Sequence, residues 1–403
     1  MELQCNVQTY EWGKLGYDSK VAVLHKLSNP SFEVDDNTPY AELWMGTHGN
    51  APSKVKENGQ LLSSLIEEKP QYLGDLVLCR FGNELPFLLK ILSINKALSI
   101  QAHPSKDIAE ELHKSHPEIY KDPNHKPEFT IALTKFEALC GFRPIDEIKG
   151  FVKNIRELAT IVGVDMAEKF ICSNETNEKE MLKQCFRSLM LCPEDFVTHQ
   201  HKQMLFKFSA LDEKTRFDQM AHLFERLSSQ FPNDIGCFVI YFLNYVVLQP
   251  NQALYLGPNE PHAYLSGDCV ECMACSDNII RAGLTPKYKD VEALCRILTY
   301  NSKPAHDQLL QPVREDAFCQ LFKPPVPDFA VVRIEIPVNL KSYTLKRRES
   351  ASILIVINGS GKMAFTNLKA GVVLFIPANE KSEIVDIASD MLMFQAMANV
   401  DLF

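Results

Sequence analysis

The sequence contains the stretch Ala253-Leu-Tyr-Leu-Gly-Pro-Asn-Glu-Pro-His262, in which a short apolar run ends at a proline and a polar corner. A second stretch of the same form is Val372-Val-Leu-Phe-Ile-Pro-Ala-Asn-Glu-Lys381. An apolar strand that runs twice into the same kind of turn predicts two related β-barrels or jelly rolls. In this alignment Lys381 stands where the first copy has His262, and a protonated lysine is a poor metal ligand. We therefore expect only the first barrel to bind a metal.

In the rest of the chain, the pattern of apolar residues predicts a mainly β fold with an α-helical insertion. Short β-type runs alternate with turn residues, except in one segment whose apolar side chains recur at helical spacing and where glycine nearly disappears. We divide the chain into a first β part, the helical insertion, a second part of the same β domain, and a C-terminal jelly roll without metal. These parts are residues 1–144, 145–234, 235–321 and 322–403.

Several elements can be predicted individually. Residues 20–24, 87–92 and 331–336 are short apolar runs bounded by turn residues, which is typical of strands. Residues 105–114 are predicted as a helix that has Ser105 as its N-cap.

The composition excludes several classes of protein. The net charge is -9, from 42 Lys plus Arg against 51 Asp plus Glu, which argues against a general nucleic-acid or membrane-surface binder. Any anionic ligand therefore needs a local cluster of cations. The most apolar stretch, residues 235–248, is 14 residues long and contains Asn244, whereas a membrane span needs roughly 20. The 12 cysteines are scattered, and the N-terminus resembles no secretory signal, so we expect a soluble, reduced, cytoplasmic protein.

Four polar side chains are candidates for a metal site. Gln101 and His103 are two residues apart in an expected strand, so they face the same way. Glu128 follows Pro127, which cannot donate to a ladder, so its strand is expected at an edge or a bulge. His262 comes from the first repeat. One amide, two imidazoles and one carboxylate suit a divalent metal, and the alternative is that each group is satisfied separately.

A second metal motif is less convincing. Cys269-x2-Cys272-x2-Cys275 has a thiol spacing found in zinc and iron–sulfur sites, but no fourth cysteine is suitably spaced. We interpret these thiols as buried small side chains.

Other charged groups near these motifs leave their function open. The loop Arg281-Ala-Gly-Leu-Thr-Pro-Lys287 could wrap an anion, or it could be a solvated surface loop. Glu271 and Asp277 can serve one site only if the chain bends between them. His48 fits a pocket wall and a packed turn equally well.

Four motifs in this chain resemble those of one known family. The longest, 26 residues, is His262-Ala-Tyr-Leu-x-Gly-x-x-Val-Glu-x-Met-Ala-x-Ser-Asp-Asn-x-Ile-Arg-Ala-Gly-x-Thr-Pro-Lys287. The others are Tyr120-x-Asp-x-Asn-His-Lys-Pro-Glu128, Tyr40-Ala-Glu-Leu-Trp-Met-Gly-Thr-His48 and Ser99-Ile-Gln-Ala-His-Pro104. They are similar to the signatures of type I phosphomannose isomerases. The resemblance runs from Tyr10 to beyond Lys287, and more loosely into the C-terminal domain.

The resemblance implies a zinc enzyme built on cupin-type jelly-roll barrels with a helical insertion, with one Zn²⁺ per chain. Such enzymes interconvert mannose 6-phosphate and fructose 6-phosphate through an enediolate, which supplies GDP-mannose synthesis. A monomer that partners only a small sugar phosphate, without nucleic acid or membrane, is expected. The turn before the first repeat reads Pro250-Asn251-Gln252 here where the family usually has Pro-Gly-Glu. Asparagine tolerates positive φ, so the turn should survive.

The resemblance also assigns roles to particular residues. The implied metal ligands are Gln101, His103, Glu128 and His262. The implied catalytic arginine is Arg281, and the implied substrate-binding residues are Lys90, Ser99, Asp277 and Lys287. Lys126 and Glu271 are both candidates for the base that moves the proton between C2 and C1, and His48 is a candidate for assisting ring opening. Two alternatives remain: a catalytically silent sugar-phosphate-binding cupin, which would lack a ligand or Arg281, and an iron oxygenase, which would usually show two histidines and a carboxylate.

Overall fold

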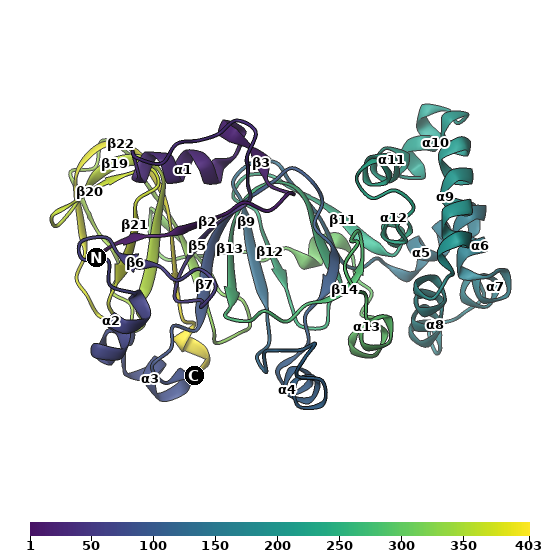
Figure 1. The fold of residues 1–403 in the computed structure, drawn as a ribbon, viewed down its shortest axis with the longest axis horizontal. Coiled ribbons are helices and arrows are strands. Elements are labelled where there is room, and N and C mark those ends of the chain that lie inside the picture. Colours follow the sequence, from purple (N-terminus) through teal and green to yellow (C-terminus); the bar gives the residue numbers. More distant parts are fainter.

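The computed structural model describes residues 1–403 as two ten-stranded sheets, a two-stranded sheet and a group of helices at one end (Figure 1). The central sheet has the order β11-β10-β13-β7-β5-β2. Off this path, β8 and β9 pair with β13, β14 pairs with β8, and β12 pairs with β9. Its strands are β2 (Asn6–Gln8), β5 (Glu42–Met45), β7 (Phe87–Ile94), β8 (Ile100–Ala102), β9 (Glu128–Ala132), β10 (Phe136–Phe142), β11 (Leu243–Leu248), β12 (Ala253–Leu256), β13 (His262–Ala274) and β14 (Ile280–Gly283).

The second sheet has the order β15-β16-β17-β22-β19-β21-β1-β6, with β18 and β20 at its side. Its strands are β1 (Glu2–Gln4), β6 (Lys54–Val55), β15 (Val313–Arg314), β16 (Cys319–Phe322), β17 (Ala330–Ile336), β18 (Ser342–Thr344), β19 (Ser352–Met363), β20 (Thr366–Lys369), β21 (Val373–Ile376) and β22 (Glu383–Met397). The two-stranded sheet pairs β3 (Lys14–Leu15) with β4 (Pro39–Tyr40).

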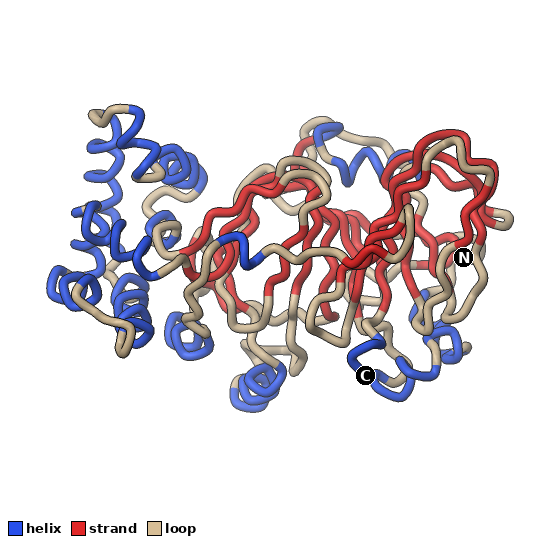
Figure 2. Tube along the Cα trace, turned by 180° about the vertical axis from the view of Figure 1, so that it is seen from behind, coloured by secondary structure: helices blue, strands red, loops and turns tan.

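The N-terminal segment joins the two sheets. β1 pairs with β21 of the second sheet, placing Leu3 opposite Val373, whereas β2 pairs with β5 of the central sheet. One hydrophobic core also runs through both sheets, and within it the rings of Phe129 and Phe322 lie 5.5 Å apart. The two sheets therefore pack as one body, with the helices at its far end (Figure 2).

The helical insertion lies beyond the end of the central sheet, in teal on the right of Figure 1. Its helices are α5 (Ile145–Asn154), α6 (Arg156–Val162), α7 (Val164–Ile171), α8 (Glu178–Met190), α9 (Glu194–Ser209), α10 (Glu213–Asp218), α11 (Ala221–Gln230) and α12 (Gly236–Val239). They share a core with Phe142 of β10 and Leu243 of β11, so the insertion is packed against the sheet. The mainly β fold with a helical insertion is confirmed.

The remaining helices connect the strands. They are α1 (Lys20–Ser28), α2 (Leu62–Glu68), α3 (Asp75–Phe81), α4 (Lys106–Ser115), α13 (Val291–Ile297) and the short 3₁₀ turns Gly16–Asp18, Pro70–Leu73, Ala305–Gln308 and Val400–Leu402. None of the helices is both long and apolar enough to cross a membrane.

The prediction of a strand at residues 20–24 is wrong, because this segment opens α1. The Ser19 side chain accepts a hydrogen bond from the Ala22 backbone N–H and so caps the helix. Val21, Leu24 and His25 are buried at helical spacing. A short apolar run such as residues 21–24 fits a strand and a buried helix equally well, and the capping serine is the informative signal. At α4 the position of Ser105 as N-cap is confirmed, although its hydroxyl bonds the Asp107 carboxylate rather than a backbone N–H.

The repeat is present, but its predicted alignment is wrong by one residue. Asn259 and Asn379 both have positive φ, at 63° and 62°, and Asn251 (76°) and Gly371 (86°) precede them at equivalent places. These two left-handed turns align β12 with β21. In that alignment Ser382, not Lys381, occupies the position equivalent to His262. The sequence alignment was anchored on proline, whereas the turn is set by the residue that adopts positive φ. The positive φ of Asn251 also confirms that the altered turn survives.

Neither strand order closes on itself, so a closed barrel is not found. β9 begins directly after Pro127 and is flanked by β12 and β13, so the expectation of an edge or bulge is also wrong. Because the proline precedes the first paired residue, the ladder does not need its missing N–H.

Candidate active site

The candidate active site lies on one face of the central sheet, where neighbouring strands line up charged side chains. The register sets Trp44 of β5 opposite Lys90 of β7, and Lys90 opposite Glu271 of β13. β9 continues the row at Thr130, which is opposite Glu271 and two residues from Glu128. Residues two apart share a face, so the pleat gathers these groups on the same side.

Three of the predicted ligands meet at the end of this face. His103 Nε2 lies 3.3 Å from one carboxylate oxygen of Glu128, and His262 Nε2 lies 3.4 Å from the other. One ligand atom from each of the three residues lies within 4.8 Å of the others, and all three side chains are buried. Two imidazoles and a carboxylate at this spacing can hold a divalent metal.

The second nitrogen of each imidazole fixes its tautomer. His103 Nδ1 is 2.6 Å from the backbone oxygen of Asn278, and His262 Nδ1 is 3.0 Å from that of Glu260. The Nδ1–H groups donate to these carbonyls, so both Nε2 lone pairs face the Glu128 carboxylate. Each Nε2 is buried without a hydrogen-bond partner. Burial lowers the pKa of His103 to about 4, which keeps the ring neutral at neutral pH. Imidazoles that are held in one orientation, each with an unpaired Nε2 atom, are what a metal site requires.

Gln101 stands beside this group. β8 lies between β13 and β14, and its register places Gln101 opposite both His262 and Arg281. The hydroxyl of Ser99 donates to the Gln101 side-chain oxygen at 3.4 Å. The structure therefore brings Gln101 next to one ligand, while its own ligation stays a prediction.

Lys126 and Glu128 form a buried ion pair of 3.4 Å. Burial alone would raise the pKa of Glu128, but its neighbours, the Lys126 ammonium among them, outweigh it and hold that pKa well below its usual range. The Glu128 carboxylate is therefore ionised and available to a cation.

Next to the triad lies a second cluster, in which Lys90 is shared between two acids. Its ammonium is 3.2 Å from Glu271 and 3.8 Å from Glu42, and all three side chains are buried. Burial acts to lower the pKa of Lys90, but the surrounding carboxylates raise it overall, so the lysine is charged. Burial, together with Glu128 and Glu42, raises the pKa of Glu271 to about 7 despite the opposing effect of Lys90.

Most of the remaining predicted residues lie in the loop that carries His48 and in the segment that follows β13. β13 ends at Ala274, and the chain then bends to bring Asp277 to 3.3 Å from His48 Nε2. His48 holds the pKa of Asp277 below its usual range. Arg281 is half-buried on β14, Lys287 is exposed in the following loop, and neither takes part in an ion pair of the structure.

Sequence reasoning missed Glu42 and Trp44. Both lie in the motif that ends at His48, but the histidine is the only residue of this motif that is predicted to belong to the site. The Trp44 indole N–H donates to Glu42, its ring lies 4.8 Å below the Lys90 ammonium, and its edge meets the His48 ring at 5.0 Å. Period-two alternation along β5 was the signal that could have found the pair.

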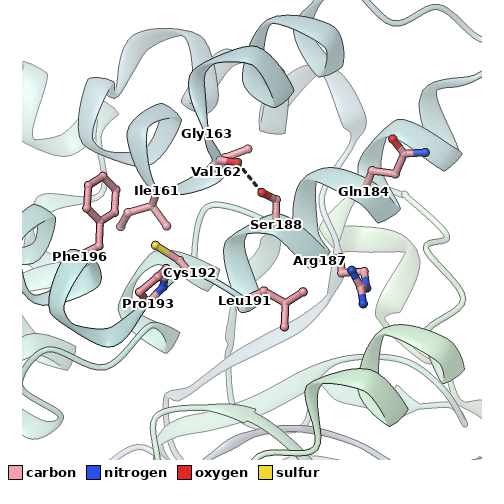
Figure 3. A pocket seen from close by; sticks show the side chains of 10 residues that line it. All are labelled: Ile161, Val162, Gly163, Gln184, Arg187, Ser188, Leu191, Cys192, Pro193 and Phe196. Carbon is pink, nitrogen blue, oxygen red and sulfur yellow. Dashed lines mark hydrogen bonds between the residues drawn. The ribbon is translucent and has the colours of Figure 1, made fainter.

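Other groups lie apart from this site. Cys269 and Cys272 are buried free thiols, whereas Cys275, the third thiol of that motif, is only partly buried. A cavity of about 450 Å³ in the helical insertion is lined by Ile161, Leu191 and Phe196 and contains no cluster of acids or histidines (Figure 3).

Three family models match the chain. Residues 1–145 match the phosphomannose isomerase type I catalytic domain, residues 161–243 its helical insertion domain, and residues 320–366 its C-terminal domain.

Individual relatives match over nearly the whole length. Mannose-6-phosphate isomerase from Mus musculus is 43% identical, with 98% of this chain and 97% of the relative covered. The apo form of mannose 6-phosphate isomerase from Salmonella typhimurium superposes with a TM-score of 0.83 at 30% identity, covering 98% of each chain. A mannose 6-phosphate isomerase bound with zinc and yttrium gives 0.82 at 30% identity, again covering 98% of each chain. The chain therefore belongs to the type I phosphomannose isomerase family.

Proposed function

We propose that this protein interconverts D-mannose 6-phosphate and D-fructose 6-phosphate, the reaction named by its relatives. The observation that carries the proposal is the buried triad of His103, Glu128 and His262 lying beside a glutamate, Glu271, whose pKa is raised to about 7. A metal site next to a half-ionised carboxyl group suits proton transfer at a carbon next to a carbonyl.

We further propose that the triad and Gln101 hold one Zn²⁺ per chain. The Nε2 atoms without hydrogen-bond partners and the ionised Glu128 fit a metal of intermediate softness, such as zinc, which takes nitrogen and oxygen ligands. When bound, zinc supplies a Lewis acid that polarises the sugar oxygens. The zinc-bound relative supports the choice of metal.

In this proposal Glu271 is the base and Lys126 stabilises charge. The Glu271 carboxylate takes the proton from C2 of the open-chain aldose. The C–H electron pair forms the C1–C2 double bond, and the carbonyl electrons move to O1, giving the enediolate. The O2 proton passes to O1, and Glu271 returns its proton to C1 to give the ketose. Arg281, a permanent cation without an acidic partner, offsets the charge that develops on the oxygens.

The other predicted site residues bind the phosphate group of the substrate and help to open its sugar ring. Lys287 is the exposed cation that can bind the phosphate group of the substrate. Ser99, which directly precedes β8, can donate a hydrogen bond to the same group. His48, held by Asp277 at 3.3 Å, is placed to move a proton during ring opening. Lys90 is already shared by two carboxylates, so we infer that it acts on the substrate mainly through Glu271.

The same reasoning extends to the fold. We propose that each ten-stranded sheet derives from a cupin-type jelly roll and that the second has lost its ligands. The matched left-handed corners at Asn259 and Asn379 support a common origin, and Ser382 at the place of His262 leaves the second copy without an imidazole.

The test is the formation of fructose 6-phosphate from mannose 6-phosphate by the purified, zinc-loaded protein, with unphosphorylated mannose as the matched control. We expect turnover of the phosphate ester and little of mannose. No turnover by folded, zinc-loaded protein would replace the enzyme with a silent sugar-phosphate binder.

A further inference from the structure

We propose that Glu42, fixed in place by Trp44, is a positioning residue that shares Lys90 with Glu271 and thereby keeps Glu271 a competent base. This inference rests on the proposed function, because it concerns the base of that reaction.

The geometry ties Glu42 to Lys90 by two routes. One oxygen of Glu42 lies 3.8 Å from the Lys90 ammonium, and the other accepts the Trp44 indole N–H. The Trp44 ring itself packs against the same ammonium, at 4.8 Å. Glu42 and Trp44 share one face of β5 and stand next to Lys90 in the sheet, so they form one rigid support for it.

The charges of the cluster are unbalanced. The groups that face Glu271 are Lys90 from β7, Glu42 from β5, Glu128 from β9, Lys126 from the segment before β9, and Tyr264 and Cys269 from β13 itself. With Glu271 ionised, three carboxylates surround two ammonium groups. A fold that needed only a salt bridge for Lys90 would already have one in Glu271, and a further buried acid costs desolvation energy.

The extra acid has a chemical consequence. If Lys90 faced Glu271 alone, its full attraction would favour the ionised carboxylate and weaken it as a base. Because Glu42 competes for the same ammonium, Glu271 keeps a higher affinity for the proton that it must take from C2. The pKa of Glu271, raised to about 7 with Glu42 among its causes, agrees with this arrangement.

The test is the variant Glu42→Gln, which keeps the shape and can still accept the Trp44 N–H. We expect the acid limb of the pH profile of kcat/KM to move down by at least about half a pH unit, while the plateau falls by less than about tenfold. A loss of kcat/KM that is equal at every pH, with the limb unmoved, would show that Glu42 is merely structural and would overturn the proposal.

A matched variant separates charge from contact. Trp44→Phe removes the indole donor but keeps the charge of Glu42, so its acid limb must not move down. A downward shift as large as that of Glu42→Gln would overturn the assignment to the charge of Glu42. If Glu42→Gln folds too poorly to assay, a downward shift of at least about half a pH unit in Trp44→Phe alone would overturn the assignment.

A readout independent of turnover separates this inference from the proposed function. The chain has two tryptophans, so the ¹⁵N-labelled indole N–H signal of Trp44 can be identified by its loss in Trp44→Phe. We expect the signal to titrate with Glu271, at lower pH in Glu42→Gln and not at all in Glu271→Gln. If the protein showed no isomerase activity, an unchanged midpoint would overturn the inference, and a lowered midpoint would support the coupling of Glu42 to Glu271.

Discussion

His103 and His262 are oriented by hydrogen bonds to backbone carbonyls rather than to acidic side chains. Each Nδ1–H donates to a main-chain oxygen, so the Nε2 lone pairs are aimed at Glu128 before any ion arrives. The carboxylate of Glu128 supplies the negative charge of this group.

We predict that Glu128→Gln loses its zinc, because the amide removes that charge and can offer only one oxygen. Zinc content after dialysis, measured by mass spectrometry, checks this. The matched control is Glu137→Gln, which changes another buried glutamate, paired with Arg226, and should retain zinc. Full zinc content in Glu128→Gln would remove Glu128 from the ligand set.

Arg281 is predicted to act on the reaction and not on the metal. Arg281→Ala should retain zinc while kcat falls by about 10²-fold or more, the effect of losing one group that stabilises a developing oxyanion. Steady-state kinetics and zinc content check this together. Arg296→Ala, which removes an exposed arginine paired with Glu111, should leave kcat unchanged.

Glu271 makes activity and stability depend on pH in opposite directions. A base must be ionised, so kcat/KM should fall in acid with a midpoint near pH 7, or lower once the metal adds its charge. The folded-state pKa is raised from 4.5, so the stabilising contribution of the protonated group is complete below about pH 4.5 and is lost as pH rises through about 7. Glu271→Gln should flatten that part of the stability profile, measured by urea unfolding. A profile unchanged by this substitution would contradict the raised pKa.

At the scale of the element, α1 lies against the turn that leads from β20 into β21. A Cβ at Gly371, where φ is +86°, would lie 1.9 Å from the Leu24 backbone oxygen of α1. Gly371→Ala should therefore lower the free energy of unfolding by more than about 2 kcal/mol. Gly59→Ala is the matched control, because φ is +74° there but no atom lies within 4 Å; it should cost about 1 kcal/mol. If thermal unfolding showed equal losses of stability in Gly371→Ala and Gly59→Ala, the backbone near Gly371 would have moved to avoid the clash with Leu24, which would contradict this prediction.

The sequence predicted some elements well and others poorly, for physical reasons. The strands at residues 87–92 and 331–336 were predictable because their apolar runs are bounded by turn residues. The segment at residues 20–24 was not, because a short apolar run does not distinguish helix from strand. The repeat was visible, yet its register depended on positive φ at Asn259 and Asn379, which residue types alone do not reveal. Glu42 escaped notice because its role depends on cross-strand register with Lys90.

At the scale of the whole molecule, the site is built from segments far apart in the sequence. His103, Glu128, His262 and Glu271 come from either side of the helical insertion, and only the pairing of β13 with β7, β8, β9 and β10 brings them together. Motif resemblance could name these residues, but their distances and burial follow from that long central strand. The insertion contributes helices that extend the core and places none of the candidate site residues.

The second sheet is joined to the first by the chain's own N-terminus. β1 lies between β21 and β6, and the Met1 amino group donates to the Phe375 backbone oxygen at 2.8 Å. The central sheet and the second sheet therefore share a core, which packs against β5 and β7, the strands that carry Glu42 and Lys90.

The central claim is that the buried triad holds the metal on which isomerisation depends. The most direct measurement is fructose 6-phosphate formation from mannose 6-phosphate before chelation, after chelation, and after zinc is added back. We predict turnover that is lost with the metal and restored by zinc, with the fold retained throughout by circular dichroism. Turnover that persists after complete removal of the metal would contradict this account.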